Sequence, residues 1–241
     1  MITISPGHFG KGSGAVSLID EAVEARKVAQ ALSRELKKLS INVHFLEDTV
    51  SKNQSQNIGY LVAAHNKTMR ELDVSIHFNA VADVRAEGIG TEVLYVNPAV
   101  QPLAQQLSTA IAKAGSFKNR GAKRRTDLGF LNGTAKQALL IEVCFVNSKE
   151  DVVNYEQHFT AICAAIAQVL AGRVHIWPFS SGALTSRVLD MWADEQAIIR
   201  QLERGVADGV FQEVWLQRAK AGTLSIHDYL ALSALQLKKY F

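Results

Sequence analysis

Short apolar runs alternate, over residues 1–171, with longer stretches in which apolar side chains recur every three or four positions. The clearest of these stretches begins near Leu18, where Val28, Leu32 and Leu36 fall on one side of a helix and leave lysines and arginines for the other. The length and apolarity of the short runs predict strands over 2–5, 41–46, 74–76, 91–96 and 139–145. The helical spacing also predicts helices over 58–69, 100–114 and 155–170.

Strands that alternate with helices favour one fold class. Consecutive parallel strands need long crossover connections, and these are usually helices that cover the faces of the sheet. The pattern therefore predicts an α/β fold, a mostly parallel twisted sheet with helices on both faces.

The pattern changes after Gly172. Residues 173–182 combine Trp177, Pro178, two serines and a second glycine, which favours neither a helix nor a long strand. Beyond them apolar residues return at helical spacing, and a last helix is predicted from Ser225, with Asp228 in a capping-box position. We expect a catalytic domain over 1–172, a linker over 173–182 and a small all-α appendage over 183–241.

Composition narrows the class of protein. The chain has 241 residues, 48% hydrophobic and 20% charged, which is a globular profile. A formal charge of +3 argues against a nucleic-acid partner. Residues 1–5 carry no basic signal segment, and no apolar run approaches the roughly 18 residues of a membrane span. We expect synthesis in the cytoplasm without a signal peptide and no integral membrane segment. Cys144 and Cys163 lie in apolar segments and are expected to be reduced, buried thiols.

Four polar residues are predicted to converge on one edge of the sheet. His8 and His77 follow or close apolar strands, and Glu142 interrupts the last one. Glu21 falls in the first turn of the first helix, whose start lies at the same edge. Ligands bind outside the carboxyl ends of parallel strands. Two imidazoles and one carboxylate are a ligand set that catalytic zinc favours, and the other carboxylate is left to move protons.

Each residue also has a structural interpretation. A histidine at a strand end is more often a satisfied polar group than a ligand, and Glu21 would suit the positive end of a helix dipole. Glu24, one turn further on, is an alternative to Glu21. Glu142 is harder to explain structurally, because an ionised carboxylate in so apolar a run is costly. The remaining histidines are expected to be structural or on the surface: His44, His65, His158, His175 and His227.

Five segments, in order, resemble the zinc-dependent N-acetylmuramoyl-L-alanine amidases of the Amidase_3 type, over roughly residues 1–171. The most specific segment is Ser75-Ile76-His77-Phe78-Asn79-Ala80. The others are Ile2 to His8, the helix bearing Glu21, Asn119-Arg120-Gly121 and Leu140 to Asn147. Two positions depart from the family pattern. Ser5 replaces a usual aspartate and Phe9 a frequent glycine, and both changes are expected to alter the surroundings of the metal ligands.

The resemblance implies a function and a site. His8, Glu21 and His77 would hold one zinc ion per chain, and Glu142 would be the catalytic acid and base. Asn79 and Arg120 would contact the substrate, peptidoglycan. The bond cleaved would join N-acetylmuramic acid to L-alanine, in an endolysin or autolysin that reaches the cell wall after release or non-classical export.

Other interpretations remain open at this point. The same ligands would serve a zinc peptidase acting on stem peptides, or a non-catalytic peptidoglycan-binding protein with structural zinc. A cysteine hydrolase using Cys144 with His77 is a weaker candidate. The basic residues between 118 and 125 either steer an anionic substrate or form a solvated loop. The appendage is a wall-binding, regulatory or dimerising module, and the oligomeric state is open.

Overall fold

The computed structural model describes residues 1–175 and 195–221. The chain divides into two compact units, residues 1–174 and 175–241. The first unit carries one six-stranded sheet with the strand order β2-β1-β3-β6-β4-β5. Its strands are β1 (Ile2–Pro6), β2 (Val43–Phe45), β3 (Leu72–Asn79), β4 (Thr91–Tyr95), β5 (Asn119–Arg124) and β6 (Gln137–Phe145).

The directions of the strands decide which residues meet at the edge of the sheet. β2, β1, β3 and β6 are parallel, whereas β4 pairs with β6 in the antiparallel sense and β5 is parallel to β4. The carboxyl ends of β1, β3 and β6 therefore lie at the same edge as the beginnings of β4 and β5. This mixed sheet confirms the mostly parallel α/β fold class.

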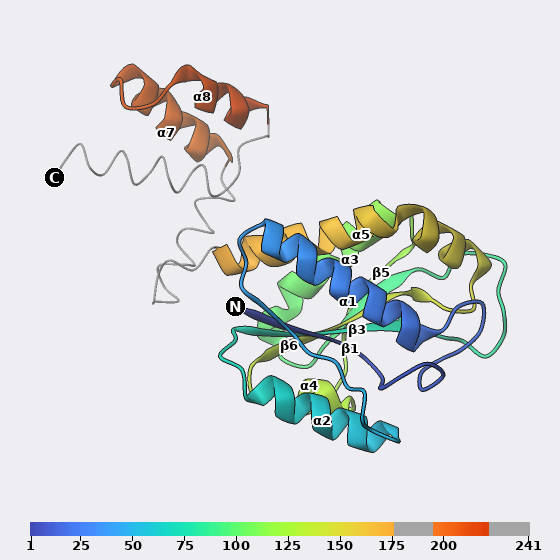
Figure 1. Ribbon diagram of the computed structural model, residues 1–241. Helices are drawn as coiled ribbons and strands as arrows, with labels where there is room; N and C mark the ends of the chain where they lie inside the picture. The colour runs from blue at the N-terminus through green and yellow to red at the C-terminus, as the bar shows by residue number, and fades with distance from the viewer. Residues whose placement is uncertain (176–194, 222–241) are drawn as a thin grey trace. The chain divides into compact units, whose positions relative to one another are not determined.

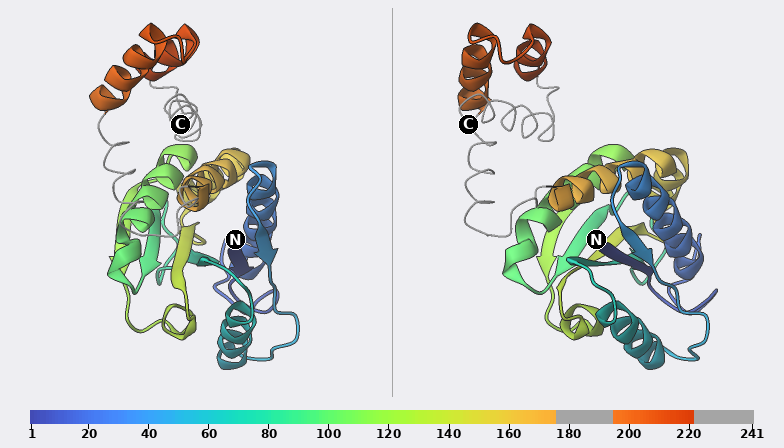
Figure 2. Two further views of the ribbon diagram at one scale, coloured as in Figure 1. Left: turned by 90° about the vertical axis from the view of Figure 1, so that its left-hand side faces the viewer. Right: turned by 60° about the vertical axis from the view of Figure 1, so that its left-hand side comes forward.

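Helices cover both faces of the sheet (Figure 1). One face carries α1, α3 and α5, and the other carries α2 and α4, an arrangement that Figure 2 shows from two further sides. The bounds are α1 (Glu21–Lys38), α2 (Gln54–Asn66), η1 (Pro98–Val100), α3 (Gln101–Gly115), α4 (Gly129–Gly133) and α5 (Lys149–His175). Each face buries its own apolar cluster, because each strand sends alternate side chains to opposite sides.

The two clusters differ in size. The large cluster joins apolar residues of β1, β3 and β6, among them Ile4, Ile76 and Ile141, to α1, α3 and α5. The smaller cluster packs Leu61 of α2 and Phe130 of α4 against β4 and β6. The site described below borders the smaller cluster, so α2 and α4 lie next to it.

The start of α1 is fixed by its own sequence. Asp20 is the N-cap and accepts a hydrogen bond from the Val23 amide at 3.2 Å, and Glu21 and Glu24 lie in the positive first turn. The helix therefore begins at Glu21 rather than near Leu18. This start places Glu21 at the edge of the sheet where β1 and β3 end.

A β-bulge interrupts the pairing of β3 with β6. His77 pairs with Glu142, but Asn79 pairs with Phe145, so two steps along β3 oppose three along β6. The extra residue reverses the alternation of side chains after Glu142. As a result Cys144 lies in the large cluster and is fully buried, on the other face of the sheet from Glu142.

The bulge removes the cysteine-hydrolase alternative. Burial raises the pKa of the Cys144 thiol well above its ordinary value, and nearby carboxylates raise it further. A thiol held protonated in an apolar core is a poor nucleophile. Strict alternation along a strand would place Cys144 on the same face as Glu142, two residues before it, but alternation fails at the bulge.

Two elements differ from the sequence-based expectations. Residues 119–124, expected to be a loop, form edge strand β5 beside β4. Its composition, Asn-Arg-Gly-Ala-Lys-Arg, carries no apolar pattern, and backbone pairing with β4 rather than burial holds it in place. The short helix α4 (Gly129–Gly133) was also not expected, and α5 is longer at both ends than the predicted 155–170.

The second unit is described over residues 195–221. There α7 (Glu195–Ala207) and α8 (Glu213–Lys220) pack through Ile198, Leu202, Phe211, Leu216 and Ala219. The helical spacing over 184–202 lies only in part within the described residues, and the helix expected from Ser225 lies outside them. Among the helices within 1–175 and 195–221, none has the length and apolarity needed to cross a membrane.

Candidate metal and catalytic site

Three of the expected ligands meet at the edge of the sheet. His8 follows β1, Glu21 opens α1 and His77 lies near the end of β3. Glu21 Oε1 lies 2.9 Å from His77 Nδ1 and 2.9 Å from His8 Nε2. The three ligand atoms all lie within 4.8 Å of one another. The structure therefore brings together the two imidazoles and one carboxylate that the sequence places far apart.

The backbone around these ligands is constrained. His8 has φ 66°, a left-handed conformation that a residue with a side chain rarely adopts. A Cβ atom on Gly7 would lie 2.1 Å from His77 Cε1, and one on Gly14 would lie 2.7 Å from both Glu21 Oε2 and His8 Cδ2. Both glycines are needed because the chain passes directly against the ligands.

The donor atoms suit a metal ion. His8 Nε2 is buried and has no hydrogen-bond partner in the part of the chain that the structure describes, although it lies 2.9 Å from Glu21 Oε1, because the two atoms are not aligned for a hydrogen bond. A cation bound among the three ligand atoms would satisfy the buried lone pair of His8 Nε2. Two nitrogen donors and one carboxylate oxygen match the three protein ligands of a catalytic zinc site, which keeps a fourth position open.

Glu21 is ionised in this arrangement. Burial alone would raise the pKa of its carboxyl group, but hydrogen bonding to His77 and the proximity of His8 outweigh burial and hold the pKa below its usual range. Glu21 Oε1 also accepts a hydrogen bond from the Phe78 amide at 3.2 Å, and Oε2 accepts one from Ala15 at 2.8 Å. These contacts fix the carboxylate among the ligands. Glu24 instead accepts a hydrogen bond from the Tyr155 hydroxyl at 2.9 Å, away from the cluster.

Glu142 lies beside this cluster. It pairs with His77 across β3 and β6, and its Oε2 atom is buried without a hydrogen-bond partner among residues 1–175 and 195–221. Burial raises the pKa of Glu142 to about 8, with smaller contributions from the negative charges of Glu21 and Glu92. A cation bound by the neighbouring ligands would lower that pKa. A carboxyl group that titrates near neutrality can both accept and return a proton.

Glu92 binds the side chains of Asn79 and Arg120, the two residues expected to contact the substrate. It pairs with Glu142 across β4 and β6 and is 5% exposed. Asn79 donates a hydrogen bond to Glu92 Oε1 at 3.0 Å, and Arg120 donates to Oε2 at 2.6 Å. Lys123 also donates to Oε2. Burial alone would raise the pKa of Glu92, but these cations lower it overall.

The sequence-based prediction did not include Glu92, because it considered polar residues that follow strands, and Glu92 lies near the beginning of one. β4 runs opposite to its neighbour, so its beginning lies where the ends of β3 and β6 lie. A carboxylate within the apolar run 91–96 was the available signal. Since Lys123 and Arg120 are paired with Glu92, neither belongs to a solvated loop.

Ser5 turns away from the ligands. Its hydroxyl lies 3.0 Å from His65 Nε2, and His65 Nδ1 lies 2.8 Å from Asp73 Oδ1. Arg70 donates two hydrogen bonds to Asp73, at 2.7 and 2.8 Å. Ser5, His65 and Asp73 are fully buried. Ser5, which replaces the usual aspartate, therefore links β1 to α2 and does not orient His8. The Phe9 amide donates to Ser13 Oγ at 3.1 Å.

Together, these features define an α/β domain with a His/Glu/His cluster suited to a metal ion beside a buried carboxyl group. Residues 2–171 match the family model of N-acetylmuramoyl-L-alanine amidase, Amidase_3. The chain belongs to this family, which confirms the resemblance based on its motifs.

Individual relatives agree with this assignment. An uncharacterized protein of Clostridium perfringens is 34% identical over 162 residues, which is 65% of this chain and 47% of that protein. The probable cell wall amidase LytH of Staphylococcus epidermidis is 28% identical over 171 residues, 70% of this chain and 56% of LytH. The catalytic domain of the CD27L endolysin, which targets Clostridia difficile, is 26% identical with a TM-score of 0.63, over 70% of this chain and 95% of that domain. The chain spans about half the length of the curated relatives it matches.

Proposed function

We propose that this protein is a zinc-dependent amidase that hydrolyses the bond between N-acetylmuramic acid and L-alanine in peptidoglycan. The observation that carries the proposal is the convergence of His8, Glu21 and His77, with ligand atoms within 4.8 Å of one another, next to Glu142. A purely structural metal site has no need of an additional unpaired carboxyl group at its side.

His8, Glu21 and His77 would hold the zinc ion. When bound, zinc supplies a Lewis acid that polarises the scissile carbonyl group and makes water acidic enough to attack near neutral pH. Glu142 takes the proton from the attacking water and returns it to the leaving amine of L-alanine. Asn79, Arg120 and Lys123, held by Glu92, line the edge of the site and interact with polar groups of the substrate.

We also propose a role in breaking down the cell wall, as an endolysin or autolysin. Similarity to the CD27L endolysin domain and to a probable cell wall amidase supports this role. In either role the protein is made in the cytoplasm and acts after it reaches the wall, through lysis or a non-classical route. The second unit would then bind the wall, regulate the enzyme or mediate dimerisation.

The test is mass spectrometry of fragments released from purified peptidoglycan by the zinc-loaded protein, with a chelated sample as the control. Stem peptides with a free N-terminal alanine, absent after chelation, are the expected products. Cuts within the stem peptide would instead identify a peptidase. Binding to peptidoglycan without zinc-dependent release would identify a non-catalytic protein.

A further inference from the structure

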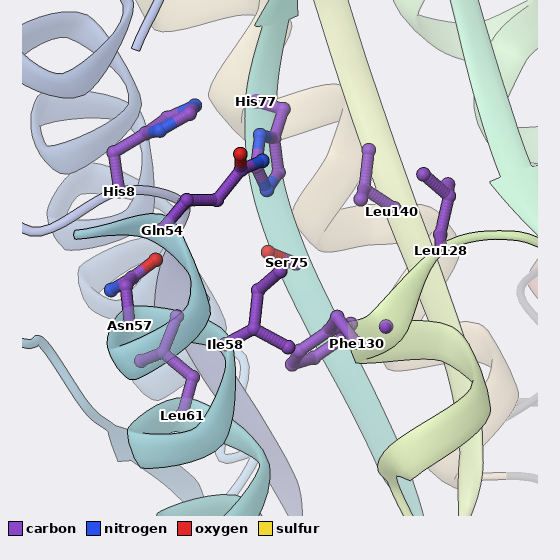
Figure 3. A pocket seen from close by; sticks show the side chains of 12 residues that line it. His8, Gln54, Asn57, Ile58, Leu61, Ser75, His77, Leu128, Phe130 and Leu140 are labelled. Atoms are coloured by element: carbon purple, nitrogen blue, oxygen red, sulfur yellow. The ribbon is translucent and has the colours of Figure 1, made fainter. Parts of the chain in front are cut away.

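A small cavity opens beside the metal-ligand cluster, between the sheet and helices α2 and α4 (Figure 3). It has a volume of about 80 Å³. Gly7, His8 and His77 border it on the side of the cluster, and Gln54 and Asn57 border it on α2. The remaining wall is almost entirely apolar and consists of Ile58, Leu61, Leu128, Gly129, Phe130 and Leu140.

Besides the proposed metal ligand His8, Ser75 contributes a polar group to the cavity that has no partner among the described residues. Ser75 is 1% exposed, lines the cavity and has a hydroxyl oxygen without a hydrogen-bond partner among the described residues. Figure 3 shows this side chain between His77 and the apolar residues Ile58 and Phe130. Leaving a buried hydroxyl unpaired costs free energy, so such groups usually have a ligand or water as partner. The cavity is therefore a mainly apolar pocket in which the Ser75 hydroxyl can form a hydrogen bond with a ligand.

The pocket lies within reach of the scissile bond. Ser75 precedes His77 by two residues on the same face of β3, a distance of roughly 7 Å along the strand. Leu140 precedes Glu142 by two residues on β6 in the same way. A group attached directly to the reacting amide therefore spans the distance from the metal-ligand cluster to the pocket.

The apolar lining of the pocket and the place of Glu142 select one side of that amide. The sugar on the acyl side carries polar groups around its ring, and a wall formed mainly by Ile58, Leu61, Phe130 and Leu140 would leave those groups without hydrogen bonds. The leaving amine has to face Glu142, because Glu142 returns the proton to it. Leu140, two residues before Glu142 on β6, lines the pocket. The group that reaches the pocket is therefore the side chain of the residue that supplies the amine.

We propose that this pocket binds the side chain of the first stem-peptide residue and that Ser75 Oγ hydrogen-bonds a polar atom on that side chain. This inference rests on the proposed amidase function and deepens it. The pocket has more room than the methyl group of alanine fills. It accepts a serine side chain, whose hydroxyl group pairs with Ser75, and it admits the branched side chain of valine.

The first experiment compares four synthetic muramyl dipeptides that differ only in the first residue: glycine, L-alanine, L-serine or L-valine. The zinc-loaded full-length protein is expected to cleave the serine substrate with a kcat/KM at least equal to that for alanine. Valine is expected to be cleaved within about tenfold of alanine. Rejection of both larger residues would overturn the proposal.

The second experiment measures the serine-to-alanine ratio of kcat/KM in Ser75→Ala. Loss of one hydrogen bond is expected to lower this ratio by roughly three- to tenfold. Ser108→Ala is the matched control, since Ser108 is also fully buried but bonds to the Gln105 carbonyl in α3. An unchanged ratio in Ser75→Ala, with both substrates slowed equally, would make Ser75 a structural residue and overturn its assigned role.

A third experiment fills the pocket. Ile58→Phe is expected to lower kcat/KM for the valine substrate at least tenfold more than for the glycine substrate. Ala63→Phe, on the exposed side of the same helix, is the control and is expected to affect all four substrates equally. Equal effects of Ile58→Phe on all four would contradict the location of the pocket. Failure to cleave any muramyl dipeptide would instead contradict the proposed function itself.

Discussion

Glu142 combines two properties that one residue rarely has in a purely structural role. Its Oε2 atom is buried and has no hydrogen-bond partner within the residues that the structure describes, and its register partner is the proposed ligand His77. The burial that raises its pKa also makes it a competent proton acceptor and donor. The catalytic role is therefore separable from metal binding, because Glu142 is not among the three clustered ligands.

Glu142→Gln is expected to bind zinc with nearly unchanged affinity and to lose at least about 100-fold in kcat, because proton transfer is removed and the ligands remain. Calorimetric zinc titration and the rate of muramyl dipeptide hydrolysis measure the two effects. Glu24→Gln is the control, as Glu24 is bonded to Tyr155 and not to the cluster. Rapid hydrolysis by zinc-loaded Glu142→Gln would refute the assignment.

Gly7→Ala tests how closely the backbone approaches the site. The new Cβ atom would lie 2.1 Å from His77 Cε1, so the imidazole has to move away from Glu21 and His8. We expect zinc affinity to fall by more than about 100-fold, beyond the effect usual for groups that only orient ligands. Competition with a chromogenic chelator measures the affinity.

A matched control for this substitution is Gly59→Ala in α2. An added Cβ atom there meets nothing within 4 Å, and alanine favours a helix over glycine. We expect unchanged zinc affinity and a small gain in stability. If Gly7→Ala bound zinc as tightly as Gly59→Ala, the proposed arrangement of ligands would be wrong.

At the scale of elements, α2 is anchored to the sheet by a buried polar network. Ser5 of β1 and Asp73 of β3 both contact His65 of α2, and Arg70 completes the set. α2 also forms one wall of the pocket beside the ligands. The network therefore links the stability of this helix to the geometry of the proposed substrate pocket.

Asp73→Asn tests the network through its pH dependence. Burial alone would raise the pKa of Asp73, but hydrogen bonds from His65 and Arg70 lower it below the ordinary value of 3.8. A lowered folded-state pKa adds stability above about pH 4 and loses it as the pH falls through the folded-state value. We expect Asp73→Asn to lower the free energy of unfolding by about 3 kcal/mol at pH 7, and by progressively less as the pH falls below about 4.

Urea unfolding between pH 3 and 7 measures this difference. Asp127→Asn is the control, because Asp127 pairs with Arg125 on the exposed surface. That substitution is expected to change stability little at any pH. A deficit for Asp73→Asn that did not vary with pH would show that the lost contribution is not the charged network.

At the scale of the whole molecule, the residues of the site all belong to the first unit. The large cluster extends from Ile2 to Ala171, and the smaller one lies within the same range. The second unit has its own cluster between α7 and α8. Folding and the proposed chemistry are therefore expected to require residues 1–174 alone.

We predict that a fragment of residues 1–174 unfolds in one cooperative thermal transition. We also expect it to hydrolyse muramyl dipeptides with a kcat/KM within about threefold of the full chain. Differential scanning calorimetry and the dipeptide assay measure these properties, with the full chain as the reference. A fragment that unfolds without a cooperative transition would show that the first unit depends on residues 175–241.

Local patterns in the sequence were sufficient to predict the fold class and to single out His8, Glu21, His77 and Glu142 as candidates for the site. Apolar periodicity is a local property, and polar residues after apolar strands stand out against it. The family motifs added their order and proposed roles. The same local signals identified the strands of the central sheet, because burial on both faces demands continuous apolar runs.

The other residues of the site could be identified only from the folded arrangement of the strands and helices. The reversed direction of β4 brings Glu92 to Glu142, the bulge in β6 turns Cys144 away, and pairing with β4 makes a strand of a polar segment. The pocket lined by Ser75 forms where α2 and α4 pack against the sheet. Strand direction, register and helix packing depend on contacts between distant residues, and no local pattern encodes them.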